Sequence, residues 1–422
     1  MGIPSYFSYI IQNHPTVLRK YSHLVQENIY FARLYLDCNS ILYDCYRQIP
    51  SDCSLIDLET QLLEKTAMQI QNYILQLQPN ELVYIAFDGV APTAKMEQQR
   101  NRRYKSWFET TIMTKMEDRP KADVYKTTSM FTPGTLFMKK LSIYMKHFFK
   151  KKEKKYHTKQ IIVTTPDEAG EGEHKLYAHL RNNPTLNPCA IYGLDADLMM
   201  LSICNLQYCS QIYIFRESPQ FAKTILAKTN FGCLSEDEPL FIDMGIMSRS
   251  ISAEMQCEAP HNFRMFDYVF LCFFLGNDFL PHFPSLNIRT LGINALLDSY
   301  KKVIGSTQER YLLAKRSDGF QIQWKEVYRL IRDLALKEEA LWKQEYAIRS
   351  KWDKKPAMLQ LKKTAKEKVD LFQNTPVLYR KEEKYINPYQ EGWESRYYDI
   401  LFPSNGVEKD SIIRNYLEGI EW

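Results

Sequence analysis

The chain has 422 residues, which is longer than one ordinary hydrophobic core and predicts two or three domains. Its hydrophobic share of 45%, charged share of 25% and net charge of +5 are typical of a soluble globular protein. The longest apolar run, residues 268–276, is well short of the roughly 18–20 residues that span a bilayer, and residues 1–7 contain no signal-peptide core. The nine cysteines form no C-x-x-C pair, which argues against a zinc ribbon or a disulfide framework and favours an intracellular protein.

The first half of the chain alternates short strand-like runs with longer helical patterns. The strand-like runs are residues 34–36, 82–87, 160–164, 190–192 and 212–215. Helical patterns such as 59–78 and 134–150 lie between them, and such alternation predicts a mostly parallel sheet with helices on both faces. We therefore expect an α/β fold in this half.

The second half is predicted to be mainly helical from about residue 262. Residues 324–349 place apolar side chains three and four positions apart, and residues 356–373 continue with charged helical sequence. A polar stretch at 245–262 marks a soft boundary, so we predict one domain over 1–250 and a helical domain over 251–422.

Acidic residues follow the predicted strands. Asp37 ends the first strand, Asp88 the second, and Asp195 and Asp197 follow the run 190–192. In an open α/β sheet, ligands bind at the carboxyl ends of the strands, so these side chains are expected to converge.

Two further acidic segments add to this set. Glu171 and Glu173 belong to a Gly-Glu-Gly-Glu sequence where a helix should begin, and the glycines allow close approach and unusual backbone angles. Asp278 follows the apolar run 268–275. Clustered acids repel one another unless cations neutralise them, and carboxylate-rich sites suit Mg²⁺ or Mn²⁺ better than zinc.

Each acidic motif alone has a simpler explanation. A single Asp after a strand is commonly a turn or a helix cap, and an E-x-E is usually surface charge. The pair Asp195 and Asp197 can be a capping pair or a calcium-loop fragment, although it lacks the EF-hand spacing. Only the joint pattern favours a metal site.

A basic helix is predicted directly after Asp88. Pro92 ends a turn, and a helix from Thr93 places Lys95, Gln99, Arg102 and Arg103 on one face, which we call the basic face. Met96, Tyr104 and Trp107 are expected to pack inward on another side. Arginine forks suit phosphate geometry, so the basic face is a candidate phosphate site. The run 139–159, with nine lysines and one acid, is interpreted instead as a solvated surface.

Several blocks of this sequence closely resemble the signature blocks of the Xrn family of 5′-to-3′ exoribonucleases. They are MGIPSYF, LYLDCNSILYDC, IAFDGVAPTAKMEQQRNRRY, FTPGTLFMKKL, GEGEHK, GLDADLMML and FLGNDFLPHFPSLNIR. They occur in family order over residues 1–290, and WESRYYDILF and YLEGIEW extend the resemblance more thinly to the end.

The resemblance implies a PIN-like α/β nuclease core followed by a helical domain. It implies two Mg²⁺ ions, with Mn²⁺ as an alternative, held by the acids Asp37, Asp88, Glu171, Glu173, Asp195, Asp197 and Asp278. It also implies that the basic face binds a 5′-monophosphate, and that the enzyme processively degrades single-stranded RNA to nucleoside 5′-monophosphates. A monomer acting in mRNA decay is expected.

Three features depart from the family pattern. Tyr43 stands where the family often has His, and we expect it to stack on the first base of the RNA. The chain stops at Trp422, so a short or C-terminally truncated member is expected. The zinc-knuckle insertion of the nuclear branch is missing between about 216 and 241, which favours a cytoplasmic protein, with the nucleus as the alternative.

Two other functions stay open from the residues alone. One is a flap-type 5′ nuclease acting on structured DNA, and the other is an RNA-binding protein without turnover. For Lys175, a role near the scissile phosphate and a place on the helix surface are equally favoured, and for His174 a structural hydrogen bond is favoured.

Overall fold

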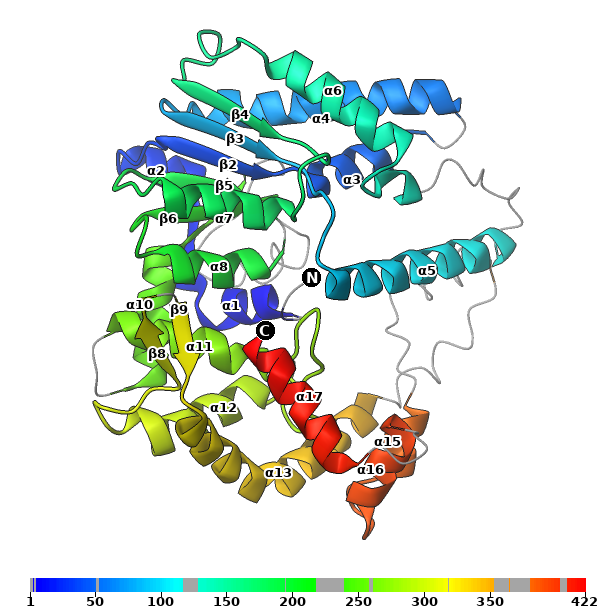
Figure 1. Cartoon of the computed structure of the whole chain (residues 1–422), viewed down its shortest axis with the longest axis vertical. Helices are drawn as coiled ribbons and strands as arrows, with labels where there is room; N and C mark the ends of the chain where they lie inside the picture. The colour runs from blue at the N-terminus through cyan, green and yellow to red at the C-terminus, as the bar shows by residue number, and fades with distance from the viewer. Residues whose placement is uncertain are drawn as a thin grey trace. The chain divides into compact units, whose positions relative to one another are not determined.

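The computed structural model describes residues 3, 5–50, 53–116, 128–193, 195–217, 239–257, 261–317, 319–352, 364, 380–402 and 408–422. The chain divides into two compact units. Figure 1 colours the ribbon from blue at the N-terminus to red at the C-terminus. Unit 1 comprises Met1–Arg103 and Ala122–Glu254, and unit 2 comprises Tyr104–Lys121 and Met255–Trp422. The sequence-based domains, 1–250 and 251–422, stay a prediction.

Unit 1 is built on a seven-stranded sheet in the order β1-β7-β6-β5-β2-β3-β4. The strands are β1 (Leu18–Lys20), β2 (Arg33–Asp37), β3 (Leu82–Ala86), β4 (Gln160–Thr164), β5 (Cys189–Tyr192), β6 (Ile212–Arg216) and β7 (Leu240–Asp243). Neighbouring strands from β6 to β4 pair in parallel, and β7 is antiparallel to both β6 and β1. The predicted mostly parallel sheet is confirmed, whereas the short strands β1 and β7 were not predicted.

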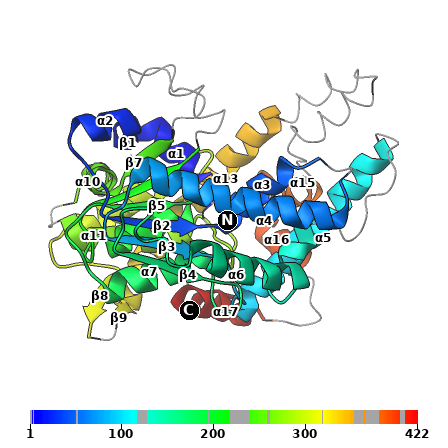
Figure 2. The ribbon, with the colours of Figure 1, turned by 90° about the horizontal axis from the view of Figure 1, so that it is seen from above.

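Helices cover both faces of this sheet. They are α1 (Tyr6–Asn13), α2 (Tyr21–Gln26), α3 (Asn39–Arg47), α4 (Leu55–Leu77), α6 (Leu136–Phe149), α7 (Gly172–Asn182), α8 (Asp197–Asn205) and α10 (Met244–Met255), with short 3₁₀ turns η1 (Pro15–Val17) and η2 (Thr128–Phe131). The helices α4 and α6 lie side by side on one face, as Figure 2 shows, and α7 packs on the other.

The pleat of the strands decides which side chains enter each layer. Leu34, Leu36 and Val83 are fully buried in the cluster that includes α4 and α6. Tyr35 and Tyr84 alternate with them and contact His179 of α7 on the opposite face. Because both faces are buried, the strands are apolar throughout, and this is why they were recognisable in the sequence.

Unit 2 is mainly helical, as predicted. Its helices are α11 (His261–Phe273), α12 (Gly292–Tyr300), α13 (Trp324–Trp352), α15 (Lys381–Ile386), α16 (Trp393–Leu401) and α17 (Lys409–Glu421), with a π-helical turn η3 (Lys301–Gly305) after α12. The helix α5 (Thr93–Met116) begins in unit 1 and continues into unit 2. A two-stranded hairpin, β8 (Leu313–Arg316) and β9 (Gly319–Ile322), was not predicted. The helix predicted at 356–373 lies outside the described residues, apart from Thr364.

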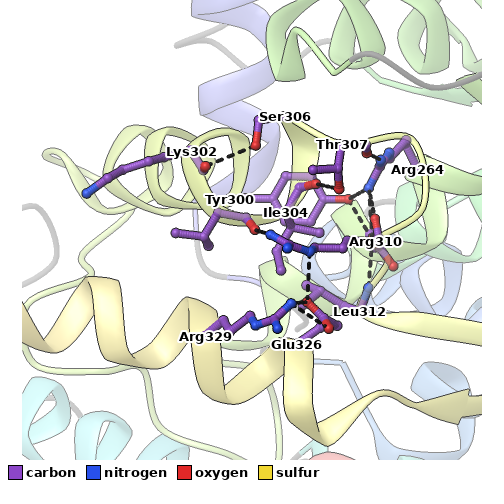
Figure 3. Close-up of polar contacts among 12 residues, drawn as sticks. Arg264, Tyr300, Lys302, Ile304, Ser306, Thr307, Arg310, Leu312, Glu326 and Arg329 are labelled. Atoms are coloured by element: carbon purple, nitrogen blue, oxygen red, sulfur yellow. Dashed lines mark hydrogen bonds and ion pairs between the residues drawn. The ribbon is translucent and has the colours of Figure 1, made fainter.

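A buried polar network fixes the chain between α12 and β8 to α11. The Arg264 side chain is 1% exposed and donates hydrogen bonds to the Tyr300 hydroxyl at 2.8 Å and to the Thr307 carbonyl at 2.7 Å, as drawn in Figure 3. The Asp267 carboxylate accepts from the Tyr300 hydroxyl at 2.5 Å and from the Leu312 amide at 2.9 Å. Buried charges are tolerated when each has such partners. No described helix is long and apolar enough to cross a membrane.

Candidate active site

The candidate active site of unit 1 lies at the carboxyl ends of three neighbouring parallel strands. Asp37 is the last residue of β2, Asp88 lies just after β3, and Asp195 lies just after β5. The strand β2 pairs in parallel with both β3 and β5, so the carboxyl ends of the three strands meet at one edge of the sheet. The fold therefore brings these acids to the same edge.

Asp88 is held by three hydrogen bonds from two segments. The side-chain amide of Asn39 donates to Asp88 Oδ2 at 2.6 Å, and Asn39 Oδ1 accepts from the Asp88 backbone amide at 3.1 Å. The backbone amide of Gly172 donates to Asp88 Oδ1 at 2.6 Å. This clamp fixes the orientation of the carboxylate, and Asn39 is a positioning residue that sequence reasoning missed.

The Gly-Glu-Gly-Glu segment forms the corner at which α7 begins. Gly170 adopts a φ of +99°, a left-handed conformation that favours glycine. A β-carbon on Gly172 would lie 2.6 Å from Asp37 Oδ1 and 3.3 Å from Asp88 Oδ1. Only glycine allows this backbone to reach the two carboxylates, which is the close approach that the sequence predicted. Glu171 is the N-cap residue of α7, and Glu173 lies in its first turn.

The carboxylates of this edge strongly influence one another. Burial raises the pKa of Asp37 well above its ordinary value, and the charges of Asp88 and Asp195 raise it further. Burial also raises the pKa of Glu173, and Asp197 and Asp37 add to the effect. Asp37 and Glu173 therefore lie within electrostatic reach of the neighbouring acids Asp88, Asp195 and Asp197.

Asp278, the seventh predicted acid, belongs to unit 2. It follows Gly276, whose φ is +86°, and Asn277, whose side-chain oxygen accepts from the amides of Phe279 at 2.9 Å and Leu280 at 2.8 Å. Asp278 is therefore presented by a tight turn that the Asn277 side chain stabilises.

The basic face begins with a buried lysine. Lys95 Nζ lies 3.3 Å from Glu171 Oε1, and the two side chains are only 8% and 10% exposed. Lys95 also opposes the rise in the pKa values of Asp88 and Glu173. The first residue of the basic face is thus in direct contact with the acids.

The rest of the basic face is more open. Gln99 and Arg103 are partly exposed and Arg102 is exposed. Burial and the charge of Asp88 raise the pKa of Tyr43, and both arginines oppose that rise, so they lie within electrostatic reach of its hydroxyl. The ring of Tyr43 packs edge-on against Phe131, with centroids 5.0 Å apart, and the residue remains 36% exposed.

One prediction for this helix was wrong. The side chains of Met96, Tyr104 and Trp107 are 42%, 68% and 58% exposed, so they do not pack inward. Most residues from 100 to 109 are exposed, and the tilted contact between Tyr104 and Trp107 is within the helix itself. Among the described residues, no apolar layer therefore packs against these side chains of α5.

Lys175 and His174 also lie beside the acids. Lys175 Nζ donates to the carbonyls of Phe87 at 2.8 Å and Thr165 at 3.1 Å. It therefore links the segments that directly follow β3 and β4. His174 Nε2 lies 3.8 Å from Glu171 Oε2 and 4.0 Å from Glu173 Oε1, which is too far for the predicted hydrogen bond to either carboxylate. Burial lowers the pKa of His174, which keeps a nitrogen lone pair available near the acids.

The acidic edge fits divalent cations of the oxygen-preferring kind. Asp37 Oδ1 is buried and has no hydrogen-bond partner among the described residues. Ligand atoms of Glu171, Glu173 and His174 lie within 4.8 Å of one another. A buried set of carboxylates needs positive charge, and its oxygen donors suit hard divalent ions. The fold and this edge together define an α/β protein whose buried acidic cluster is compatible with divalent metal binding.

Comparisons with known proteins identify the family. The profile described as "XRN 5'-3' exonuclease N-terminus" matches residues 1–218, and that described as "Xrn1 helical domain" matches residues 264–387. The chain belongs to the Xrn family, as the sequence blocks predicted.

Curated relatives extend far beyond the matched region. A 5'-3' exoribonuclease 1 from Saccharomyces cerevisiae is 32% identical over 324 residues, which cover 72% of this chain and 21% of that protein. A 5'-3' exoribonuclease 2 from Eremothecium gossypii is 28% identical over 441 residues, covering 89% of this chain and 44% of that protein. Among solved structures, the catalytic core of Rad2 in complex with a DNA substrate aligns with a TM-score of 0.39 and 14% identity, covering 80% of this chain and 81% of that one.

Proposed function

We propose that this chain is a Mg²⁺-dependent exoribonuclease that degrades single-stranded RNA from a 5′-monophosphate and releases nucleoside 5′-monophosphates. The observation that carries the proposal is the buried contact between Lys95 and Glu171, which joins the basic face to the acidic edge. A phosphate held by the basic face then lies next to the residues that would cleave the first phosphodiester bond. Membership of the Xrn family supports the same activity.

In this proposal Asp37, Asp88, Glu171, Glu173, Asp195 and Asp197 hold two Mg²⁺ or Mn²⁺ ions, and the family resemblance adds Asp278. Such ions, when bound, activate water and stabilise the leaving oxygen in phosphodiester hydrolysis. The Asn39 and Gly172 clamp keeps Asp88 oriented toward the same edge. Lys175 fixes the segments that directly follow β3 and β4, next to Asp88.

The selectivity for the 5′ end follows from the chemistry of the basic face. Lys95 supplies a compact charge, while Arg102 and Arg103 supply planar forks that match phosphate oxygens. A hydroxyl end offers these groups nothing to bind, and a triphosphate or cap adds bulk beside a buried lysine. Tyr43, partly exposed and close to both arginines, is placed in this proposal against the first base.

We further propose that the protein is a monomer and that it acts in mRNA decay. We place it in the cytoplasm because the sequence lacks the insertion typical of the nuclear branch. The chain spans 21% of the length of the yeast relative and 44% of the length of the Eremothecium relative. Processive degradation by this chain is therefore also part of the proposal.

The decisive experiment compares RNAs that differ only at the 5′ end. With Mg²⁺, the monophosphate RNA should release mononucleotides, whereas the triphosphate and hydroxyl RNAs should persist. Asp195→Ala should abolish the release. Equal activity of Asp195→Ala and wild type would refute the catalytic role, and preference for a flapped DNA would point to the other nuclease class. Tight binding of monophosphate RNA without cleavage in either Mg²⁺ or Mn²⁺ would indicate an RNA-binding protein.

A further inference from the structure

The connection between α6 and β4 concentrates positive charge. This segment, residues 150–159, holds six lysines and one glutamate, so its net charge of +5 equals that of the whole chain. We call it the lysine turn. Lys150, Lys151, Lys154 and Lys159 are exposed, and none of them forms an ion pair with any residue that the structure describes.

The lysine turn has a fixed backbone. Tyr156 is 3% exposed, and its hydroxyl donates to Gln71 Oε1 of α4 at 2.9 Å. Lys151 and His157 have φ angles of 56° and 54°, in the left-handed region that non-glycine residues rarely adopt. Such strained conformations persist only where the surroundings determine them, and they concentrate at functional sites. The lysines are thus displayed from an anchored turn.

A polar hollow adjoins the lysine turn at the amino ends of the strands. Its volume is about 590 Å³, and Arg33, Lys159 and His179 are among its lining residues. Arg33 begins β2, and Lys159 immediately precedes β4. Asp37 and Asp88 lie at the carboxyl ends of β2 and β3, whose amino ends line the hollow, so the two sites lie at opposite ends of the same parallel strands. A strand of five residues is roughly 17 Å long, so the two sites are at least about that far apart.

The chemistry of the lysine turn favours phosphodiesters. Lysine is a compact point charge on a flexible stem, which suits a run of phosphates rather than one oriented group. Tyr156, the only tyrosine, phenylalanine or tryptophan of the segment, is buried, so its ring offers no stacking surface for a base. Protein interfaces usually carry aromatic anchors and are depleted in lysine, which makes an acidic protein the weaker candidate.

We propose that the lysine turn binds the phosphate backbone of an RNA whose 5′ end occupies the candidate active site. The inference rests on the proposed function, since it supplies a second contact for the same substrate. Binding there is independent of sequence and falls as salt rises, because phosphate neutralisation releases counterions. It revises our interpretation of this segment as a merely solvated surface.

The test uses two triple variants that remove the same charge. Lys150→Gln, Lys151→Gln and Lys154→Gln change the lysine turn, while Lys325→Gln, Lys351→Gln and Lys381→Gln change exposed lysines of unit 2. Binding of a long 5′-monophosphate single-stranded RNA is measured by anisotropy in EDTA over a range of salt concentrations. Hydrolysis of a 5′-monophosphate trinucleotide, too short to reach the lysine turn, is measured in Mg²⁺.

We expect the lysine-turn variant to bind long RNA about tenfold more weakly, with a salt slope smaller in magnitude by about 2, and to hydrolyse the trinucleotide normally. The unit 2 variant should match wild type in both assays. Equal binding of long RNA by the two variants would overturn the proposal. It would also be overturned if the lysine-turn variant bound long RNA normally and lost only the binding of polyglutamate, used as an acidic polypeptide probe. Lysine-dependent binding of long RNA by a protein that cannot hydrolyse the trinucleotide would support this inference and refute the proposed function.

Discussion

Lys95 Nζ lies 3.3 Å from Glu171 Oε1, and both side chains are about nine-tenths buried. A buried ion pair is retained more often for what it positions than for the stability that it contributes. Here the pair links a helix that carries arginines to a corner that carries acids. We interpret Lys95 as shared between the phosphate of the substrate and the acidic edge.

Lys95→Met should reduce the discrimination between 5′ ends. The loss of one charge-assisted contact is worth about 1.5–3 kcal/mol, so kcat/KM for monophosphate RNA should fall roughly 10–100-fold, and that for hydroxyl RNA much less. Lys105→Met, at an exposed position of the same helix, is the matched control and should match wild type. An equal loss on both RNAs would mean that Lys95 serves the acids alone.

Gly172→Ala should impair catalysis without unfolding the protein. The new methyl group would lie 2.6 Å from Asp37 Oδ1, so at least one carboxylate must move. A displacement of this kind costs on the order of 100-fold in rate, whereas alanine in the first turn of a helix is well tolerated. Gly245→Ala, in the first turn of α10, is the control, because the nearest atom to its β-carbon is 3.3 Å away. Normal turnover by Gly172→Ala would show that the close approach is not required.

Asn39→Ala should weaken metal binding. It removes both side-chain hydrogen bonds to Asp88 and leaves the Asp88 amide without this partner. Loss of such an outer partner typically lowers metal affinity 10–100-fold, and calorimetry with Mn²⁺ measures it. Asn101→Ala, at an exposed position, is the control. Unchanged Mn²⁺ affinity would show that Gly172 alone orients Asp88.

Asp37, Asp88 and Asp195 were predictable from the sequence because each follows a buried apolar strand, and parallel strands must place their carboxyl ends together. The role of Asn39 was not, because it depends on a partner 49 positions away in the chain. The same holds for Lys175, whose ammonium binds two backbone carbonyls that only the fold brings together. The hairpin β8–β9 was missed because its strands are short and largely exposed, so they lack the apolar pattern of a buried strand.

Tyr300→Phe should destabilise unit 2. The hydroxyl accepts from Arg264 and donates to Asp267, so its removal leaves both buried charges with one partner fewer. We expect the free energy of unfolding to fall by about 1–3 kcal/mol, measured by urea titration. Tyr328→Phe is the control, because Tyr328 is 66% exposed. A change no larger than that of the control would show that backbone partners satisfy the two charges.

Divalent metal should stabilise the protein more strongly as pH rises. Burial and neighbouring acids raise the pKa values of Asp37 and Glu173, so these carboxyls bind protons more tightly in the folded state. Their contribution favours folding at low pH and is lost as pH rises from the unfolded value of about 4 through the raised folded value. The metal-free protein should therefore lose stability across this window, and Mg²⁺, which replaces the protons, should raise Tm more at high pH than at low pH.

Thermal unfolding in EDTA and in Mg²⁺ at several pH values measures this dependence, and Asp37→Asn provides its control. The amide cannot ionise, so the variant should be more stable than wild type without metal, with a flatter pH dependence and a smaller gain from Mg²⁺. Since Asp37 Oδ1 has no hydrogen-bond partner among the described residues, few protein contacts oppose the substitution. If Mg²⁺ raised Tm equally in wild type and in Asp37→Asn at every pH, the ion would bind elsewhere and the acidic edge would not be its site.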